Sequence, residues 1–484
     1  MHIAIDFGTS FSQMATMYLE QPLVLLNPGE YGIPSEFYYD ANCGVLVGQE
    51  ALDAGQGECA ANLISEVKMA IQHGKTFTLD GRTFTVQEIV HEICRAVFAR
   101  ALQIARKYPI NPTIEQVVIS IPAKFGIKER RIIHDAAKKC LDNRSVPIRI
   151  IKEPVAAALG YYKTALAKNN HILVYDLGGG TCDIALVRAD PSSTEHYTVV
   201  DSDMVRLGGR NWDEALINYI SIQLEQQIGV SIEDQPAYEE KIRRAAIMVK
   251  HDLSDSTKNR SMARIEINGK VHVIPITRNV FDEITFHLLE QTLDCLQDVY
   301  SRNVPNHTIE EIICVGGSSN MLQVETELNR RFPECKIKLH EPEHAVIHGA
   351  AVYAQLHPSL VTDASSFSYG IDSYDPDTDR DVISNVITKG SHLPVCGKRY
   401  YRPGKKQKAM RFNIYESEFT DEQYDLMEEN KLYIGSARLE LPDDATEDLS
   451  VTCEFILNTD GLLEVKAYEP SGKSVSTSIR LEDI

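Results

Sequence analysis

The amino-acid sequence predicts an α/β domain followed by an antiparallel β-sandwich. Strand-like and helical stretches alternate through about the first 355 residues, an alternation typical of α/β proteins. From residue 365 onward the chain contains strand-like runs separated by turns. Its length of 484 residues fits two to four domains of about 100 to 200 residues each. We therefore expect one domain over 1–357, a linker over 358–364 and a second domain over 365–484.

The apolar pattern predicts individual helices and strands in the α/β domain. Apolar residues recur at spacings of three and four in 89–97 and 133–141, so each stretch has one apolar face to bury. Two short β-branched runs, Val117–Ile121 and Ile172–Tyr175, are bounded by turn-forming residues. Runs of this kind are typical of buried central strands.

The C-terminal domain is predicted from short strands. The strand-like runs cover 382–387, 410–415, 432–441, 449–457 and 462–468. Asp460-Gly461 precedes the last run and is a strong hairpin signal. Successive short strands joined by such turns indicate an antiparallel β-sandwich.

Composition excludes several classes of function. With 43% hydrophobic and 24% charged residues, the chain is an ordinary globular protein. Lys and Arg number 49 against 69 Asp and Glu, so the net charge of −20 disfavours nucleic acid and anionic membranes as partners. The ten cysteines form no C-x-x-C pair, and the sequence shows neither a signal peptide nor a spanning apolar stretch. We expect a cytoplasmic protein with reduced thiols.

An internal near-repeat indicates two similar lobes that face each other. The stretch Ile3–Ser10 and the stretch Leu173–Thr181 each contain an apolar strand that ends in Asp-x-Gly. Two such units about 170 residues apart predict one turn from each lobe at a shared cleft. A phosphate chain would fit between the two turns.

The residues of these turns suit a phosphate and a magnesium ion. Glycines at 8 and 178–180 let backbone N–H groups approach an anion closely, and Thr9, Ser10 and Thr181 add hydroxyl donors. Asp6 and Asp176 would repel a bare triphosphate, so they favour Mg²⁺ held mainly through its water shell. A single Asp-x-Gly would indicate an ordinary hairpin, whereas two copies favour the phosphate site.

A third glycine-rich turn suits a nucleoside. The stretch 314–319 follows an apolar strand and precedes a helical pattern, which allows close approach of the backbone to a ligand. Alone, this feature would indicate only a tight strand-to-helix turn.

Taken together, seven motifs resemble one known family. They are DFGTSFS (Asp6 to Ser12), VISIPAKF (Val118 to Phe125), IIKEPVAAALGYY (Ile150 to Tyr162), YDLGGGTCDIALV (Tyr175 to Val187), LGGRNWDEAL (Leu207 to Leu216), VGGSSNM (Val315 to Met321) and EPEHAVIHGAAVYA (Glu341 to Ala354). In this order they resemble the DnaK-type seventy-kilodalton heat-shock chaperones. The resemblance implies an actin-like ATPase domain of two ribonuclease-H-like lobes, a linker and a β-sandwich that clamps extended apolar peptides. In that family ATP opens the clamp and hydrolysis closes it.

The resemblance assigns roles to particular residues. It implies catalytic roles for Lys68, Glu153, Thr181 and Asp183, and contacts to Mg²⁺, mainly through water, for Asp6 and Asp176. Nucleotide contacts are implied for Gly8, Thr9, Ser10, Phe11, Gly178, Gly179, Gly180, Gly208, Gly209, Lys250, His251, Ser254, Gly316, Gly317, Ser318, Asn320 and Glu343. Lys68 would orient the attacking water and stabilise charge on the γ-phosphate of ATP. From the sequence alone, a surface lysine on a helix is an equal alternative for Lys68.

The sequence departs from the family at the adenosine side. Ile247 and His251 stand where the family usually has Glu and Arg, and Asn320 replaces an Arg. Adenine affinity is therefore in question, whereas the phosphate residues match. The chain between Lys68 and the helix predicted from Val86 is also shorter than usual, so the surface that exchange factors grip should be altered.

Two positions match residues that couple the domains in the family. Arg149 corresponds to the arginine that couples to J-domain partners and to the linker, and Asp363 ends the linker. The linker 360–363 is less apolar than usual, which predicts weaker docking on the ATPase domain. A packing or surface arginine is the alternative for Arg149.

The peptide groove is expected at Ile371, Ser373, Tyr374 and Met410. An alternating apolar residue in a strand is, however, more often a core residue. The sequence ends at Ile484 directly after the last predicted strand, which predicts no helical lid and faster peptide release. Expected partners are unfolded polypeptides, a J-domain co-chaperone and a nucleotide-exchange factor.

Two further functions fit the same sequence. A phosphotransferase of the actin-like superfamily that acts on a small molecule would need a substrate-side base in the cleft and no β-sandwich. A nucleotide-dependent adaptor would have lost hydrolysis through the changes at Ile247, His251 and Asn320. ATP turnover that depends on Lys68 would exclude the adaptor.

Overall fold

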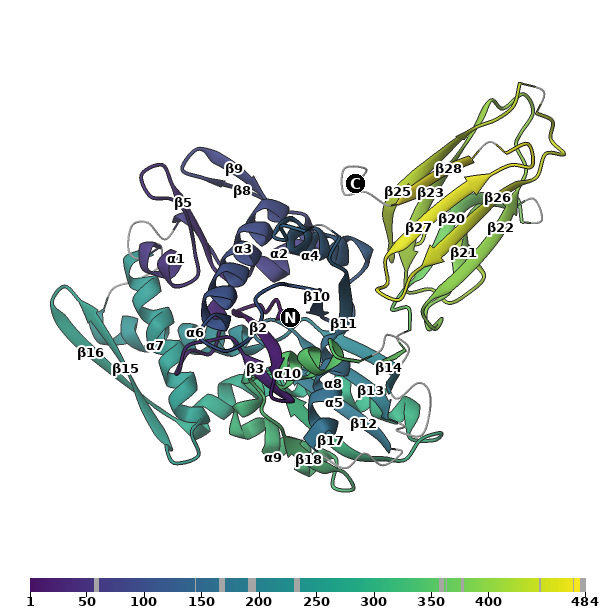
Figure 1. Ribbon diagram of the computed structural model, residues 1–484. Coiled ribbons are helices and arrows are strands. Elements are labelled where there is room, and N and C mark those ends of the chain that lie inside the picture. Colours follow the sequence, from purple (N-terminus) through teal and green to yellow (C-terminus); the bar gives the residue numbers. More distant parts are fainter. Residues whose placement is uncertain are drawn as a thin grey trace. The chain divides into compact units, whose positions relative to one another are not determined.

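The computed structural model describes residues 1–55, 61–143, 145–164, 170–189, 197–229, 236–356, 361–362, 364–375, 378–443, 445–472 and 474–478. The chain forms two compact units (Figure 1). Unit 1 contains Met1–Ala123 and Ala136–Leu360, and unit 2 contains Lys124–Asp135 and Val361–Ile484. None of the helices in the described part of the chain combines the length and the apolar character that crossing a bilayer requires.

The first sheet of unit 1 places Asp6 at the end of a central strand. Its strands are β1 (His2–Asp6), β2 (Phe11–Tyr18), β3 (Gln21–Val24), β4 (Ile33–Pro34), β10 (Gln116–Ile121) and β11 (Ile148–Lys152). Their order is β11-β10-β1-β2-β3, with β4 beside β2. Strand β1 is parallel to β10, so Asp6 lies opposite Ser120, and antiparallel to β2 through the turn after Asp6.

Smaller strands and helices surround the first sheet. The additional strands are β5 (Phe37–Asp40), β6 (Gly44–Val47), β7 (Leu63–Ile64), β8 (Thr76–Leu79) and β9 (Arg82–Thr85). The helices are α1 (Gln49–Ala54), α2 (Val67–His73) and α3 (Val86–Ala105), while α4 (Ile127–Lys139) falls mostly in unit 2. Thr85 and Glu88 form a capping box at the start of α3, whose apolar residues at three and four spacing are buried as predicted.

The second sheet of unit 1 repeats this arrangement. Its strands are β12 (Asn170–Leu177), β13 (Cys182–Ala189), β14 (Tyr197–Val205), β17 (Ile309–Val315) and β18 (Lys336–Leu339), in the order β18-β17-β12-β13-β14. Strand β12 is antiparallel to β13, where Asp176 lies opposite Asp183, and parallel to β17. The predicted near-repeat is thus two strands that each carry an aspartate at the last or next-to-last residue and turn back into an antiparallel partner.

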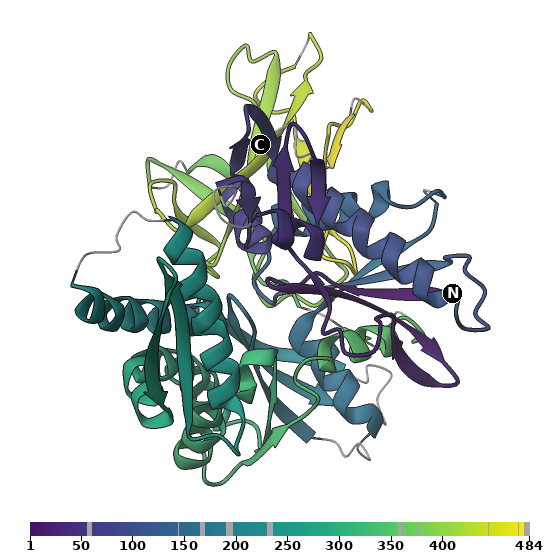
Figure 2. The ribbon, with the colours of Figure 1, turned by 90° about the vertical axis from the view of Figure 1, so that its left-hand side faces the viewer.

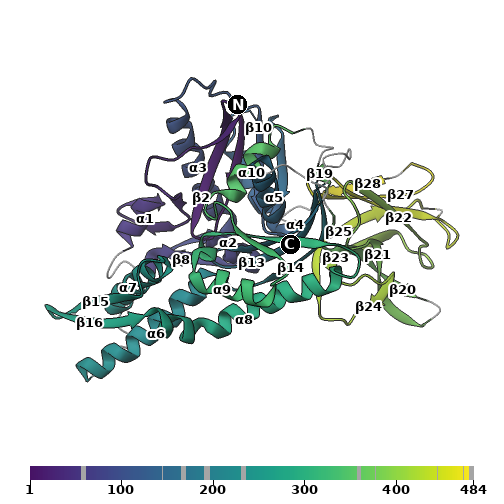
Figure 3. The same ribbon diagram turned by 90° about the horizontal axis from the view of Figure 1, so that it is seen from below.

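Helices and one hairpin complete unit 1. They are α5 (Glu153–Thr164), α6 (Gly209–Ile228), α7 (Pro236–Ser254), β15 (Arg260–Ile267), β16 (Lys270–Thr277), α8 (Arg278–Asn303), the short 3₁₀ helix η2 (Gly317–Asn320), α9 (Leu322–Arg331) and α10 (Ala345–Tyr353). The hairpin β15–β16 runs alongside α7 (Figures 1, 2 and 3).

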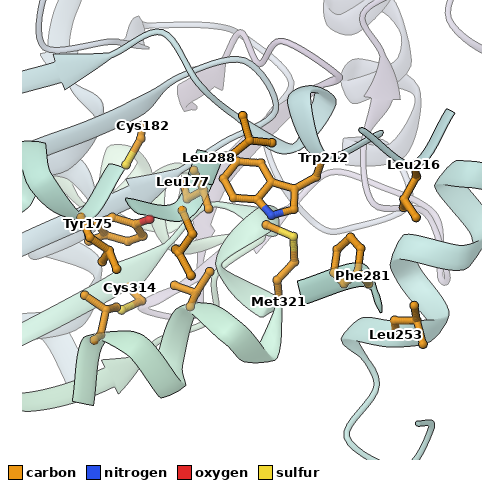
Figure 4. Close-up of a cluster of buried hydrophobic side chains, with 14 of the residues drawn as sticks. Tyr175, Leu177, Cys182, Trp212, Leu216, Leu253, Phe281, Leu288, Cys314 and Met321 are labelled. Carbon is orange, nitrogen blue, oxygen red and sulfur yellow. The ribbon is translucent and has the colours of Figure 1, made fainter. Parts of the chain in front are cut away.

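Alternation along β12 places Asp176 on the face opposite a large apolar cluster. Leu173, Tyr175 and Leu177 point into a large apolar cluster with α6, α7 and α8 (Figure 4). Trp212, the single tryptophan of the chain, lies fully buried in the same cluster. Because side chains alternate along a strand, Asp176 lies on the opposite face from this cluster. Helix α5, which begins at Glu153, also packs against β12.

Helices α5 and α10 cross with their backbones in contact. A Cβ atom on Gly349 would lie 1.6 Å from the carbonyl oxygen of Ala156, and one on Gly160 would lie 2.8 Å from that of Ala345. Neither position can hold a larger residue unless the helices move apart. This crossing sets the position of α5 and therefore of Glu153.

Unit 2 contains the predicted antiparallel β-sandwich. The sandwich strands are β20 (Ser368–Asp375), β21 (Arg380–Ile387), β22 (Val395–Tyr401), β23 (Ala409–Ser417), β24 (Gln423–Asp425), β25 (Lys431–Glu440), β26 (Val451–Leu457), β27 (Leu463–Tyr468) and β28 (Ser474–Ser478), and the short strand β19 (Val361–Thr362) lies outside both sandwich sheets. One sheet has the order β24-β21-β20-β23-β25 and the other β22-β26-β27-β28. Both contribute alternate residues to one core, for example Phe412 and Phe455.

The segment Lys124–Asp135 also belongs to unit 2, which the sequence did not predict. Ile127 is part of the sandwich core, and its N–H donates to Glu416 Oε2 at 3.0 Å. Burial and the nearby Glu129 carboxylate raise the pKa of Glu416 to about 7, while hydrogen bonds from Ile127 and Tyr369 and the charge of Arg130 oppose this rise. The uncharged form of Glu416 therefore fits the folded unit best.

The raised pKa predicts that unit 2 loses stability as the pH rises. The Glu416 carboxyl has a pKa of about 7 in the folded state and 4.5 in the unfolded state. Its contribution to the free energy of unfolding is therefore fully present below pH 4.5. The stabilisation is lost as the pH rises through 7, and it amounts to roughly 3 kcal/mol. Glu416→Gln, which keeps the hydrogen-bond acceptor, should remove this pH dependence.

Differential scanning calorimetry of the full chain at pH 5.5 and pH 8.5 tests this prediction. Tryptophan fluorescence from Trp212 reports unit 1 and identifies the remaining transition as that of unit 2. The exposed Glu440, changed to Gln, is the matched control and should leave the pH dependence intact. An equal pH dependence in wild type and Glu416→Gln would contradict the prediction.

Candidate nucleotide site

Three aspartates converge where the two sheets of unit 1 end their central strands. Asp6 accepts a hydrogen bond from Ser120 Oγ at 2.8 Å. Asp183 accepts from the backbone N–H of Ala123 at 3.1 Å and from Thr181 Oγ1 at 2.9 Å. Burial, followed by the charges of Asp183 and Asp6, raises the pKa of Asp176 to about 8. The two predicted magnesium residues and the predicted catalytic Asp183 therefore share one electrostatic site.

Lys68 and Glu153 form a buried ion pair in the same site. Lys68 Nζ lies 2.6 Å from Glu153 Oε1, and their side chains are only 7% and 8% exposed. Burial lowers the pKa of Lys68, but the charges of Glu153, Asp6 and Asp183 outweigh it, so the net shift is upward. Burial and the same aspartates, with Asp176, raise the pKa of Glu153, opposed by Lys68. Lys68 is therefore no surface lysine.

The excess of negative charge suits a divalent cation. Four carboxylates at positions 6, 153, 176 and 183 face the single ammonium group of Lys68. Their donors are oxygen atoms, the ligands that Mg²⁺ prefers. Within the described ranges, no group of three His, Cys, Asp or Glu side chains is placed to hold a metal directly. The carboxylates therefore suit Mg²⁺, and contact through its bound water stays a prediction.

The two glycine turns face each other beside the carboxylates. A Cβ on Gly179 would lie 2.6 Å from Ser10 Oγ, and one on Gly180 would lie 3.1 Å from Thr9 Cγ2. The turn at Gly8 is equally tight, because a Cβ there would lie 2.0 Å from the carbonyl oxygen of Phe11. Because these glycines lack a Cβ atom, the two turns can approach each other this closely.

The start of α6 is tied to the second turn. The N–H of Gly209 donates to Gly178 O at 3.0 Å, and a Cβ on Gly208 would lie 2.4 Å from the nitrogen of Gly180. Ser318 Oγ also donates to Gly178 O, at 2.9 Å. Gly316, which has a φ of 80°, packs against Leu177 and Asp176. The third glycine-rich turn therefore adjoins the second glycine turn, which is the arrangement that the predicted nucleoside site requires.

Three further predicted nucleotide contacts lie on helix α7. Lys250 Nζ donates to Gly209 O at 3.0 Å and to Asp213 Oδ2 at 2.7 Å. Ser254 Oγ donates to Lys250 O at 2.9 Å within helix α7. Burial and the charge of Lys250 lower the pKa of His251, while Asp213 and Glu343 act in the opposite direction. His251 and Glu343 are therefore close enough to interact.

The other predicted contacts are placed less tightly. Phe11 is 44% exposed and Ile247 is 38% exposed, while Asn320 is half-buried in η2 and Gly317 is exposed. Ile247 offers an apolar surface where a charged residue was expected from the family. The adenine contact therefore stays a prediction.

Arg149 is held inside unit 1. Its guanidinium lies 3.9 Å from the ring centroid of Tyr353, and Nη1 donates to Leu356 O at 3.1 Å. These contacts give it a packing role. Its predicted coupling role stays a prediction, and Asp363 lies outside the described residues.

The predicted peptide residues are split between core and surface. Ile371 and Met410 belong to the buried core of unit 2. Ser373 Oγ lies 3.0 Å from Ser384 Oγ, and the exposed Tyr374 donates to Asp379 at 2.6 Å. Burial favours a packing role for Ile371 and Met410, and peptide contact stays a prediction for all four.

Comparison with known proteins identifies the family. Residues 72–483 match the sequence profile of the family described as Hsp70 protein. The chain belongs to the Hsp70 family. Members of the Hsp70 family are chaperone-type ATPases with an actin-like ATPase fold and a β-sandwich. They bind ATP or ADP with Mg²⁺ and work on unfolded polypeptides with co-chaperones.

Sequence reasoning missed several residues at the candidate site. Asp213 pairs with Lys250, and Ser120 holds Asp6. Arg210 pairs with Glu66, which stands two positions before Lys68. A cation directly after Gly208-Gly209 is visible in the sequence, but its partner is distant along the chain and could not be inferred from it.

Proposed function

We propose that this Hsp70-family chain is an ATP-dependent chaperone that binds extended apolar segments of unfolded polypeptides. In this proposal unit 1 is an actin-like ATPase of two ribonuclease-H-like lobes, one built on each sheet. The observation that carries it is the buried Lys68–Glu153 pair, surrounded by three aspartates beside two facing glycine turns. A structural ion pair alone would not require so many buried carboxylates.

The proposed hydrolysis of ATP assigns a role to each of these residues. Lys68 Nζ, fixed by Glu153, would orient the attacking water toward the γ-phosphate and stabilise its developing charge. The Asp183 carboxylate, which accepts a 2.9 Å hydrogen bond from Thr181 Oγ1, would receive the proton that the water loses. As the water oxygen bonds to the γ-phosphorus, the bond from that phosphorus to the bridging oxygen would break, and ADP would leave with both electrons of that bond. Backbone N–H groups and hydroxyls of the two turns would bind the phosphates. Mg²⁺, contacted through water by Asp6 and Asp176, would neutralise part of the phosphate charge.

The β-sandwich would supply the second activity. The edge strand of an antiparallel sheet can form main-chain hydrogen bonds with an extended peptide. The exposed Tyr374 and the neighbouring Ser373 are the accessible candidates. ATP binding and hydrolysis would control peptide release, with a J-domain co-chaperone and an exchange factor as proposed partners.

Peptide binding and ATP turnover test the proposal together. Fluorescence anisotropy of a labelled extended apolar peptide, first with ADP and Mg²⁺ and then with ATP, should show binding followed by release. ATP turnover measured in parallel should be detectable and dependent on Lys68. Absence of peptide binding in both states would reject the chaperone proposal and favour the phosphotransferase. Peptide binding without turnover would favour the adaptor.

A further inference from the structure

We propose that Arg210 is a positioning residue for ATP hydrolysis, which holds the turn that delivers Lys68 to the site. The inference rests on the proposed ATPase function. It concerns a contact between the first turn of α6 and the segment before α2, both in unit 1. Arg210 need not touch the reacting atoms, because it would act through Glu66.

Arg210 connects three elements of the site. Its backbone N–H donates to Gly179 O at 3.0 Å, which fixes it to the second glycine turn. Nη1 forms an ion pair with Glu66 Oε1, and Nη2 donates to Thr9 O at 3.4 Å. The side chain is only 19% exposed. Arg210 thus links the second glycine turn, through its backbone, to the first glycine turn and to the segment before Lys68, through its guanidinium.

Glu66 is the residue that needs such support. It has a φ of 63°, a left-handed conformation that is strained for a non-glycine residue. It occupies the N-cap of α2, yet its side chain makes no capping hydrogen bond there. Its carbonyl instead accepts from the N–H groups of Met69 at 2.9 Å and Ala70 at 3.1 Å. The direction in which α2 starts therefore depends on the backbone of Glu66.

Lys68 stands on the first turn of this short helix. Helix α2 spans only Val67–His73, so its own hydrogen bonds orient it weakly. A shift of its N-terminus would move Lys68 Nζ away from the 2.6 Å contact with Glu153. Misplacement by about 1 Å can cost about 100-fold in rate, so a tether at Glu66 has catalytic consequences.

The Arg210 side chain keeps its positive charge in this setting. Burial lowers its pKa to about 10, whereas Glu36, Asp213 and Glu214 act in the opposite direction. Arg210 therefore remains charged at neutral pH. Because its two terminal nitrogens serve different partners, a lysine with one ammonium group cannot replace both contacts.

Single-turnover ATP hydrolysis by the full chain tests this role. Arg210→Ala should lower the rate at saturating ATP by about 10-fold to 100-fold, with little change in the Kd of ADP. Glu66→Gln should have a similar effect, and combining the two changes should add little. The exchange of both charges, Arg210→Glu with Glu66→Arg, should restore part of the rate. Arg244→Ala, an exposed arginine on α7, is the matched control.

Hydrogen exchange gives a second readout that does not need activity. The amides of Met69 and Ala70, which bond to Glu66 O, should exchange faster in Arg210→Ala than in wild type. An unchanged rate in Arg210→Ala, or fully additive effects of the two single changes, would overturn the positioning role. If wild type shows no turnover, the ATPase proposal fails by itself, and unchanged exchange in Arg210→Ala would then overturn the tether.

Discussion

Lys68→Met should reduce the single-turnover rate of ATP hydrolysis by about 100-fold to 1,000-fold. Methionine keeps the length and volume of the side chain but removes the positive charge next to Glu153, Asp6 and Asp183. In the proposed mechanism, the attacking water then loses the ammonium group that would orient it, and Mg²⁺ and the turns alone offset the charge that develops on the phosphate. The Kd of ADP should change much less, because the glycine turns and hydroxyls that bind the phosphates remain.

Two comparisons separate this effect from a loss of folding. Removing one partner of a buried ion pair can cost about 3–5 kcal/mol, so Lys68→Met is paired with the double variant Lys68→Met, Glu153→Gln. The double variant has no unpaired charge and should recover stability but not activity. The exposed Lys75, changed to Met, is the control and should hydrolyse ATP normally. A Lys68→Met rate within threefold of wild type would contradict the proposed mechanism.

Gly349→Ala should cause the largest loss of stability. The new Cβ would lie 1.6 Å from the carbonyl oxygen and 2.4 Å from the carbonyl carbon of Ala156. Backbone atoms cannot change rotamer, so α10 and α5 must separate along their whole contact. We expect the free energy of unfolding of unit 1 to fall by about 3 kcal/mol or more. Urea unfolding followed by Trp212 fluorescence measures it, because the chain has one tryptophan.

Gly317→Ala is the matched glycine control for stability. No atom lies within 4 Å of a Cβ at this position, so the change should stay within about 0.5 kcal/mol of wild type. If Gly349→Ala does not fold at all, Gly160→Ala provides a milder version, since its closest contact is 2.8 Å. A loss below about 1 kcal/mol for both variants would show that the helices do not cross as closely as described.

The parts of the site that are local in sequence could be predicted from it. Asp6 and Asp176 each lie at the end of an apolar run, two residues before a glycine, so strand, turn and carboxylate can be recognised within ten residues. Alternation of apolar residues likewise predicted the β-sandwich strands, which the structure confirms. Short-range patterns were sufficient because strand geometry and turn chemistry are determined locally.

Contacts between distant residues could not be predicted in this way. A lysine in a short helix looks exposed from its neighbours, and the burial of Lys68 depends on Glu153, 85 residues away. The resemblance, rather than the pattern, indicated its role. The alternation of apolar residues also does not show whether a side chain faces the core or a ligand. The side chains of Ile371 and Met410 face the core of unit 2. The grouping of Lys124–Asp135 with the sandwich depends on Glu416, far along the chain.

The crossing of α5 and α10 has a mechanical consequence. At Gly160 and Gly349 no side chain lies between the two helices, so there is no layer of rotamers to absorb strain. Helix α5 begins at Glu153, and α10 ends at Tyr353, against which Arg149 packs. A displacement of α10 at Tyr353 would therefore be transmitted to α5, and so to Glu153, without being absorbed by side-chain rotamers.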